Sequence, residues 1–124
     1  MDKKRILIVD DEVDATDMLK MHLERVGGFE VRAENRGSMG YSAAKEFSPD
    51  LVLLDLTMPD MDGSEVAAMI KDDPQIGKTP IVFLTASILK EEAEETQGSG
   101  DYSFLAKPAG GNEVIEKINR VLGL

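Results

Sequence analysis

The sequence predicts an α/β fold in which a parallel β-sheet carries helices on both faces. Short runs of consecutive apolar residues at 6–9, 51–54 and 81–84 are typical of strands buried on both faces. Segments with helical spacing separate these runs, and strands that alternate with helices indicate a parallel sheet with right-handed crossovers. The length of 124 residues, with 42% apolar and 31% charged residues, fits one folded domain.

Two further strands complete the predicted sheet. Residues 29–33 alternate apolar and polar side chains, a pattern typical of a strand with one face in water. This strand is therefore expected near an edge of the sheet. Residues 104–106 form a weaker apolar run and predict the last strand.

Five helices are expected from apolar residues at three- and four-residue spacing. The first carries a stripe of Met18, Leu19, Leu23 and Val26 and ends at the glycines 27–28. The others are a second around 41–47, a third around 66–70, a highly charged fourth over 88–96 and a last over 114–122, which starts after Gly110 and Gly111. The seven methionines are expected to fill the core.

The composition excludes several classes of function. With 14 basic and 24 acidic residues the net charge is −10, which argues against direct binding to nucleic acids or anionic membranes and favours cations and basic partners. The absence of cysteine excludes disulfides, thiolate metal sites and cysteine nucleophiles. No apolar run is long enough to cross a membrane or to form a secretory signal, so a cytoplasmic protein is expected.

Acidic residues follow two of the predicted strands. Asp10 and Asp11 come directly after the first run, and Asp55 ends the run at 51–54. In parallel sheets, ligands bind beyond the carboxyl ends of the strands. Crowded carboxylates need a cation or a proton, and Mg²⁺ suits oxygen ligands. Asp10 and Asp11 alone would also fit the start of a helix. Asp55, however, ends a wholly apolar strand, where an unpaired carboxylate would be costly.

A lysine and a hydroxyl are expected at the same edge of the sheet. Thr85 follows the run at 81–84, and Lys107 follows the last strand. Each has a simpler interpretation: Thr85 as a turn residue, and Lys107 as a solvated surface lysine. Lys107 precedes Pro108, and a cis bond there would direct its side chain. Together with Mg²⁺, these groups suit phosphoryl transfer to Asp55, since cations neutralise the phosphoryl oxygens while the carboxylate attacks.

Four segments of the chain together resemble a known family. They read Ile-Leu-Ile-Val-Asp-Asp-Glu at 6–12, Pro-Asp-Leu-Val-Leu-Leu-Asp-Leu-Thr-Met-Pro-Asp-Met-Asp-Gly at 49–63, Pro-Ile-Val-Phe-Leu-Thr-Ala at 80–86 and Phe-Leu-Ala-Lys-Pro at 104–108. In this order and spacing they resemble the receiver domain of two-component response regulators, of the chemotaxis-regulator type. The resemblance covers residues 1–124 and implies a flavodoxin-like five-stranded sheet of order 2-1-3-4-5 with five helices.

The resemblance implies an acceptor and a metal site. Asp55 matches the aspartate that takes a phosphoryl group from a histidine kinase or a phosphotransfer protein. Asp10 and Asp11 match the acidic pair that, with Asp55 and the backbone carbonyl of Thr57, binds Mg²⁺. The domain is then expected to catalyse its own phosphorylation and dephosphorylation, and no other reaction.

The resemblance also implies a conformational switch. Lys107 matches the lysine that pairs with the phosphoryl group, and the bond to Pro108 is expected to be cis. Thr85 matches the switch hydroxyl, Ala86 the small residue beside it, and Phe104 the switching aromatic residue. A downstream protein would then bind the face formed by the fourth helix, the fifth strand and the fifth helix, with the domain a monomer or a weak phosphorylation-dependent dimer.

Two other functions remain open on the sequence. One is a pseudo-receiver, a binding module with the same fold that never carries phosphate. The other is a phosphohydrolase with an aspartate nucleophile, which the pattern Asp55-x-Thr57 faintly resembles. The single histidine, His22, is expected to be a packing residue at the boundary of the core and not a phosphorylated group.

Overall fold

The computed structural model describes residues 3–86 and 102–124. Five parallel strands form one sheet, in the order β2-β1-β3-β4-β5. They are β1 (Arg5–Val9), β2 (Glu30–Glu34), β3 (Leu51–Asp55), β4 (Ile81–Thr85) and β5 (Tyr102–Ala106). The predicted architecture and strand order are confirmed. Only the ends differ: β1 starts one residue earlier than predicted, β2 lies one residue later, β3 and β4 each end one residue later, and β5 starts two residues earlier.

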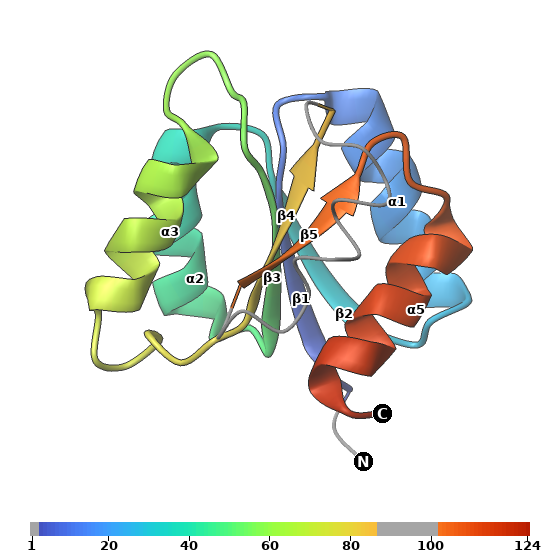
Figure 1. Cartoon of the computed structure of the whole chain (residues 1–124). Coiled ribbons are helices and arrows are strands. Elements are labelled where there is room, and N and C mark those ends of the chain that lie inside the picture. The colour runs from blue at the N-terminus through green and yellow to red at the C-terminus, as the bar shows by residue number, and fades with distance from the viewer. Residues whose placement is uncertain (1–2, 87–101) are drawn as a thin grey trace.

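Helices cover both faces of the sheet (Figure 1). On one face lie α2 (Gly40–Phe47), which follows the short 3₁₀ turn η1 (Gly37–Met39), and α3 (Gly63–Asp72); on the other lie α1 (Val13–Arg25) and α5 (Gly111–Leu122). Four of the five predicted helices are thus present. The fourth, predicted over 88–96, lies outside the described residues.

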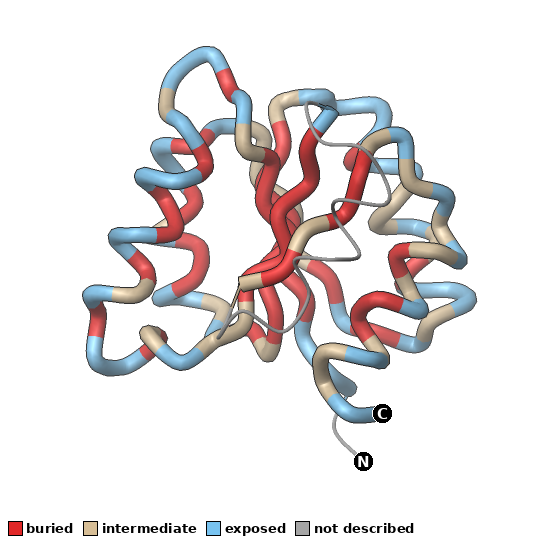
Figure 2. Tube along the Cα trace, viewed as in Figure 1, coloured by how far each residue is buried: buried red, intermediate tan, exposed pale blue. Residues whose placement is uncertain are grey.

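The core consists of two apolar layers, one on each side of the sheet. All five residues of β3 and of β4 are buried, which explains their uninterrupted apolar runs. Because successive strand residues point to opposite faces, Leu7 packs in the layer under α2 and α3, whereas Ile6 and Ile8 pack under α1 and α5. Figure 2 shows this buried centre between the exposed outer surfaces of the helices.

The predicted apolar stripe of α1 is wrong in part. Leu23 is fully buried and Leu19 packs against the core, but Met18 is 72% exposed and Val26 is 63% exposed. The expectation that the methionines fill the core is also wrong in part: Met58 is buried and Met61 packs against the core, but Met18, Met21, Met39 and Met69 are exposed. A helix buries only one face, and apolar residue type alone does not decide which positions of a short helix lie on it.

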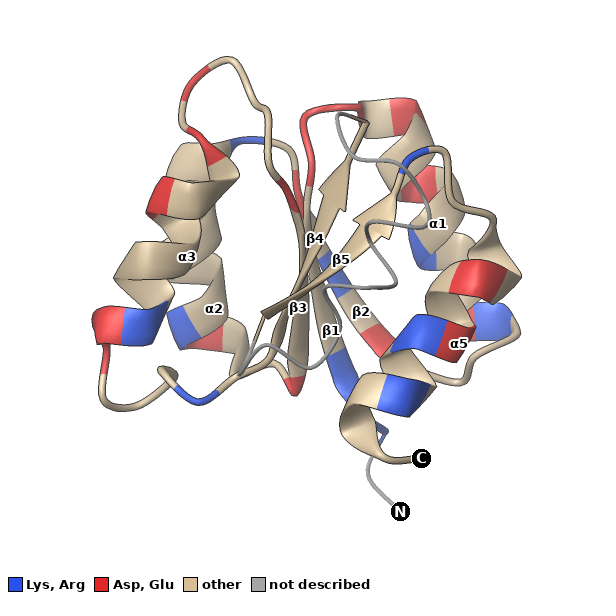
Figure 3. Ribbon diagram, viewed as in Figure 1, with Lys and Arg blue, Asp and Glu red and all other residues tan. Residues whose placement is uncertain are grey.

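Charge is distributed unevenly over the fold. Acidic residues gather on the loops that follow β1 and β3, at the carboxyl edge of the sheet (Figure 3). Lys4 and Arg5 lie at the opposite edge, where β1 begins. Within residues 3–86 and 102–124, no helix combines the length and apolar character needed to span a membrane.

Candidate functional site

The strand register brings the predicted site residues to one edge of the sheet. Val9 pairs with Leu54, and Asp55 pairs with Leu84, so Asp10 and Asp55 follow adjacent positions on neighbouring strands. Thr85 pairs with the residue just before Lys107, and the Lys107 amide donates to the Thr85 carbonyl at 2.9 Å. Residues separated by up to 97 positions therefore meet because parallel strands end at the same edge.

Three carboxylates form a cluster at this edge. Asp10, Asp11 and Asp55 each place a carboxylate oxygen so that all three atoms lie within 4.8 Å of one another. Asp10 and Asp55 are buried, at 5% and 4% exposure. Burial raises the pKa of Asp55 to about 6, and the negative charge of Asp10 adds to this rise. A hard cation would relieve this crowding, so the donor set fits Mg²⁺.

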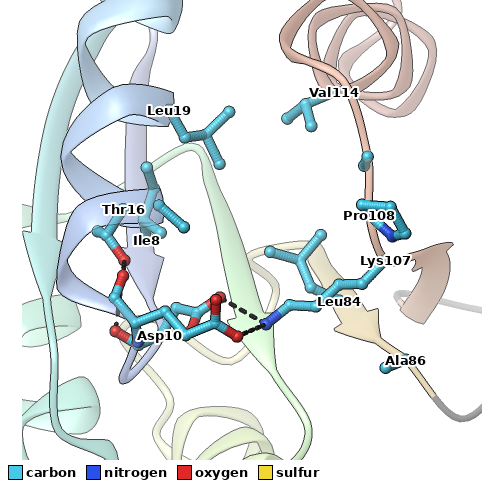
Figure 4. A pocket seen from close by; sticks show the side chains of 12 residues that line it. Ile8, Asp10, Thr16, Leu19, Leu84, Ala86, Lys107, Pro108 and Val114 are labelled. Carbon is cyan, nitrogen blue, oxygen red and sulfur yellow. Dashed lines mark hydrogen bonds and ion pairs between the residues drawn. The ribbon is translucent and has the colours of Figure 1, made fainter.

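Lys107 reaches into the cluster from the other side. Its Nζ lies 2.9 Å from Asp10 Oδ2 and 3.5 Å from Asp55 Oδ2. Figure 4 shows the Lys107 side chain extended toward Asp10. Burial lowers the pKa of Lys107, but the hydrogen bond and charge of Asp10, with the other carboxylates, outweigh burial and raise it. The lysine is therefore a permanent positive charge. The Lys107–Pro108 bond is cis, as the resemblance implied.

Glu12 is a contact of Lys107 that the sequence analysis missed. Its Oε1 lies 3.5 Å from Lys107 Nζ, and its amide donates to Asp10 Oδ1 at 3.1 Å. Its position directly after Asp10 and Asp11 was the one available signal. Lys107 is therefore shared among three carboxylates, which leaves Asp55 with only part of its charge.

The loop after β3 holds Asp55 in a defined orientation. The Thr57 amide donates to Asp55 Oδ1 at 3.3 Å, while Lys107 faces Oδ2. The Gly63 amide closes the loop on the Leu56 carbonyl at 2.9 Å. A Cβ at Gly63 would lie 2.2 Å from the Asp55 carbonyl oxygen, so this close approach of two backbones requires glycine.

The backbone of Asp10 is held by groups that the sequence analysis did not identify. Its carbonyl accepts a hydrogen bond from Asn35 Nδ2 at 2.8 Å. Its amide donates to the Glu34 carbonyl at 3.1 Å. Asn35 lies 25 positions from Asp10, and no local pattern connects the two. Only the pairing of β1 with β2 brings them together.

The two predicted switch residues, Thr85 and Phe104, lie in different surroundings. Thr85 is buried at the end of β4. Phe104 is half-buried and packs in the apolar layer under α2 and α3, with its ring 5.4 Å from Phe83. Tyr102 stacks on the same Phe83 ring at 5.6 Å. The structure thus places Phe104 in a row of three aromatic rings and not among the charged groups.

His22 also lies apart from the charged cluster. Its Nε2 is 2.9 Å from Asn112 Oδ1, and its ring lies against Gly111, where a Cβ would come within 2.3 Å. This half-buried position between α1 and the start of α5 agrees with the predicted packing role.

A pocket of about 380 Å³ lies beside Lys107, between α1 and the loop that joins β5 to α5. Figure 4 shows its walls, which share Asp10 and Lys107 with the charged cluster. Glu12 and Thr16 also line it, and the rest of the lining is apolar: Ile8, Ala15, Leu19, Leu84, Ala86, Pro108, Ala109 and Val114. The charged cluster is thus bordered on this side by an apolar surface.

An acidic triad with a lysine, at the carboxyl edge of a sheet of order 2-1-3-4-5, defines a class of α/β proteins that carry an acidic site at the strand ends. The sequence profile of one family in this class, the response regulator receiver domain, matches residues 6–119. The chain therefore belongs to the response regulator receiver domain family.

Individual relatives agree with this assignment. The chain is 39% identical over 119 residues to the transcriptional regulatory protein SrrA of Staphylococcus aureus, covering 94% of this chain and 47% of that protein. It thus spans about half the length of the curated relatives it matches.

Solved structures extend the similarity. The chemotaxis protein CheY4 of Vibrio cholerae superposes with a TM-score of 0.84 at 27% identity, covering 98% and 100% of the two chains. The N-terminal domain of a response regulator receiver protein from Methanoculleus marisnigri is 36% identical, with a TM-score of 0.70 and 97% coverage of both chains. The predicted family resemblance and flavodoxin-like fold are thereby confirmed.

Proposed function

We propose that residues 1–124 form one receiver domain in which Asp55 accepts a phosphoryl group from a histidine kinase or a phosphotransfer protein. The observation that carries this proposal is the position of the Asp55 carboxylate. It is buried, clusters with Asp10 and Asp11, and has a lysine ammonium 3.5 Å from its Oδ2. A carboxylate in this setting is oriented and partly neutralised, as an attacking group requires.

Asp10, Asp11, Asp55 and the Thr57 carbonyl are the groups that would hold Mg²⁺. The bound ion would supply positive charge to the phosphoryl oxygens. Asp55 attacks phosphorus, an acyl phosphate bond forms, and the bond from phosphorus to the donor nitrogen breaks, with the electron pair leaving on the donor. Lys107 pairs with the transferred oxygens, and the Thr57 amide keeps the aspartate plane fixed during the attack.

The product is proposed to switch the domain. A phosphoryl group adds about −1.5 to −2 charges, which draws Lys107 away from Asp10 and Glu12 and attracts the Thr85 hydroxyl. Movement of Thr85 opens space toward the aromatic row, which Phe104 fills by changing rotamer. Two packings of this kind are what a phosphate can bias.

The consequences outside the site follow from this proposal. A downstream protein would bind the face formed by the predicted fourth helix, β5 and α5. The domain would act in the cytoplasm as a monomer or a weak phosphorylation-dependent dimer. Its only chemistry would be its own phosphorylation and dephosphorylation.

The direct test is phosphorylation by acetyl phosphate with Mg²⁺, followed by intact mass. The wild-type chain should gain one phosphoryl group that is labile in base, and Asp55→Asn should gain none because an amide is a poor nucleophile. Asp73→Asn is the matched control, since Asp73 is also buried but lies outside the acidic cluster. Labelling that persists in Asp55→Asn contradicts the acceptor.

Two other results would favour the alternatives. A wild-type chain that binds Mg²⁺ yet gains no phosphoryl group is a pseudo-receiver. Multiple-turnover hydrolysis of an unrelated phosphate ester indicates a phosphohydrolase.

A further inference from the structure

The loop between β3 and α3, which follows the proposed acceptor Asp55, is called the acceptor loop here. Its carboxylate Asp60, five residues after Asp55, caps a different segment of the fold. Asp60 Oδ1 accepts from the Gly37 amide at 3.1 Å, and Oδ2 accepts from the Ser38 amide at 3.0 Å. These amides begin η1, which runs directly into α2. The acceptor loop is thus bonded to the turn between β2 and α2 through both oxygens of one side chain.

The charge of Asp60 suits this contact. The first amides of a helix have no intrahelical acceptor and carry partial positive charge. Within the described part of the chain, the residue at the cap position, Arg36, makes no side-chain capping bond. Hydrogen bonds from the Ser38 and Gly37 amides lower the pKa of Asp60. The acceptor loop therefore supplies the cap that the local sequence lacks.

Packing makes the same connection rigid. Gly37 is buried, and a Cβ there would lie 3.0 Å from the Met61 carbonyl oxygen and 3.1 Å from Met58 Cε. Any displacement of the turn toward the acceptor loop would therefore press on Met58 and Met61. These two residues flank Asp60 in sequence.

The other end of the same segment holds the acidic pair. The Glu34 carbonyl accepts from the Asp10 amide at 3.1 Å, and Asn35 Nδ2 donates to the Asp10 carbonyl at 2.8 Å. Residues 34–38, the β2–α2 bridge, thus contact Asp10 at one end and Asp60 at the other. The bridge spans the two arms of the carboxylate cluster, the one after β1 and the one after β3.

We propose that Asp60 is a positioning residue that, through the β2–α2 bridge, sets the separation between the Asp10–Asp11 pair and the Asp55 loop. This proposal rests on the proposed function, because the separation matters for the metal and the phosphoryl group. Within the described residues, the Asp60 carboxylate bonds the Gly37 and Ser38 amides and not Asp10 or Asp55. Its effect is transmitted by the bridge.

The test compares Asp60→Ala with Asp62→Ala. Both variants remove one negative charge from the same loop, but within the described residues Asp62 makes no side-chain capping bond. Amide hydrogen exchange on the metal-free chain should be faster at 57–61 in Asp60→Ala than in Asp62→Ala. In Mg²⁺ titrations followed by the amide shifts of Asp11 and Thr57, Asp60→Ala should raise Kd by about fivefold over Asp62→Ala, the lower end of linked-site couplings.

Two further variants separate positioning from folding and charge. Asp60→Asn keeps an acceptor oxygen for one amide and should recover part of the Mg²⁺ affinity. Gly37→Ala disturbs the bridge from the other side with every carboxylate intact, and should also weaken Mg²⁺ binding. In phosphorylation by acetyl phosphate, saturating Mg²⁺ should restore the rate of Asp60→Ala, because the Mg²⁺ requirement shifts and the chemical step does not.

The outcomes distinguish this proposal from the proposed function. Equal Mg²⁺ affinity and equal exchange in Asp60→Ala and Asp62→Ala overturn the positioning role while the wild-type chain still binds Mg²⁺ and is phosphorylated. A wild-type chain that binds no Mg²⁺ overturns the proposed metal site itself, and the positioning role with it. A lower melting temperature with unchanged Mg²⁺ affinity assigns Asp60 to folding alone.

Discussion

Asp55 and Asp73 are two aspartates whose side chains are almost equally exposed but whose pKa values are shifted in opposite directions. Their side chains are 6% and 7% exposed. The pKa of Asp55 is raised to about 6, whereas the pKa of Asp73 is lowered to about 2. Burial alone therefore does not decide whether a carboxylate in this fold is easily ionised.

Burial and the charge of Asp10 raise the pKa of Asp55, whereas hydrogen-bond donors around Asp73 outweigh its burial and lower its pKa. Asp73 accepts from the Tyr41 hydroxyl, from Lys45 Nζ at 2.9 Å and from the Gln75 amide at 2.8 Å, and these bonds lower its pKa in that order. Asp55 has the Thr57 amide at 3.3 Å and a lysine that it shares with two other carboxylates.

The comparison separates a structural carboxylate from a reactive one. Asp73 ties α2 to the end of α3 and is satisfied without any ligand. Asp55 is crowded by a like charge and incompletely paired, which is the state that a cation or a phosphoryl group can improve. A raised carboxylate pKa marks a candidate site here because burial and a neighbouring like charge both oppose ionisation of Asp55.

Removing the lysine beside each aspartate, Lys107 at Asp55 or Lys45 at Asp73, should give the largest difference in phosphorylation rate. Lys107→Ala should slow phosphorylation of Asp55 by acetyl phosphate on the order of a hundredfold, the usual cost of losing one preorganised charge partner. Lys45→Ala, which removes the lysine beside Asp73, should leave the rate near that of the wild-type chain. Initial rates by intact mass at saturating Mg²⁺ measure both. Equal rates in the two variants would abolish the functional distinction between the two aspartates.

Removal of one crowded carboxylate should have the next largest effect. Asp11→Ala should weaken Mg²⁺ binding about tenfold, or ~1.4 kcal/mol. The same variant should raise the metal-free free energy of unfolding by about 1 kcal/mol, since one charge repulsion is lost. Calorimetric Mg²⁺ titration and urea unfolding in a chelator test these changes. Unchanged Mg²⁺ affinity would remove Asp11 from the metal site.

Asp73→Asn should lower stability, opposite in sign to Asp11→Ala. An aspartate whose folded pKa of about 2 lies below its unfolded value contributes stability that is present above pH ~4 and lost as pH falls toward 2. The wild-type chain should therefore lose stability over that interval, and Asp73→Asn should lose less. Thermal unfolding at pH 7, 4 and 2.5 compares them. Parallel pH profiles would show that Asp73 is not the carboxylate responsible.

Tyr41→Phe should have the smallest effect. It removes the hydroxyl that contributes most to the lowered pKa of Asp73 but leaves Lys45 and the Gln75 amide in place. We expect a fall of a few degrees in Tm and a rise in the pKa of Asp73, measured by carboxyl NMR titration. Phosphorylation should be unaffected. An unchanged pKa would mean that Lys45 and the backbone amide suffice.

Local sequence determined much of this protein. Uninterrupted apolar runs specified the buried strands, because a strand covered on both faces has no polar side. The positions of Asp10, Asp55, Thr85 and Lys107 directly after those runs specified the edge at which they meet. Parallel strands end together, so no distance information was needed.

Tertiary structure alone decided which contacts those residues make. The exposure of Met18, the sharing of Lys107 with Glu12, the bond from Asn35 to Asp10 and the pairing of Asp73 with Tyr41 have no signature within a few residues of sequence. Each depends on the register of a neighbouring strand or on which helix face meets the sheet. The type and spacing of apolar residues leave the buried face of a helix uncertain by about one position, and the packing of the whole core decides which face meets the sheet.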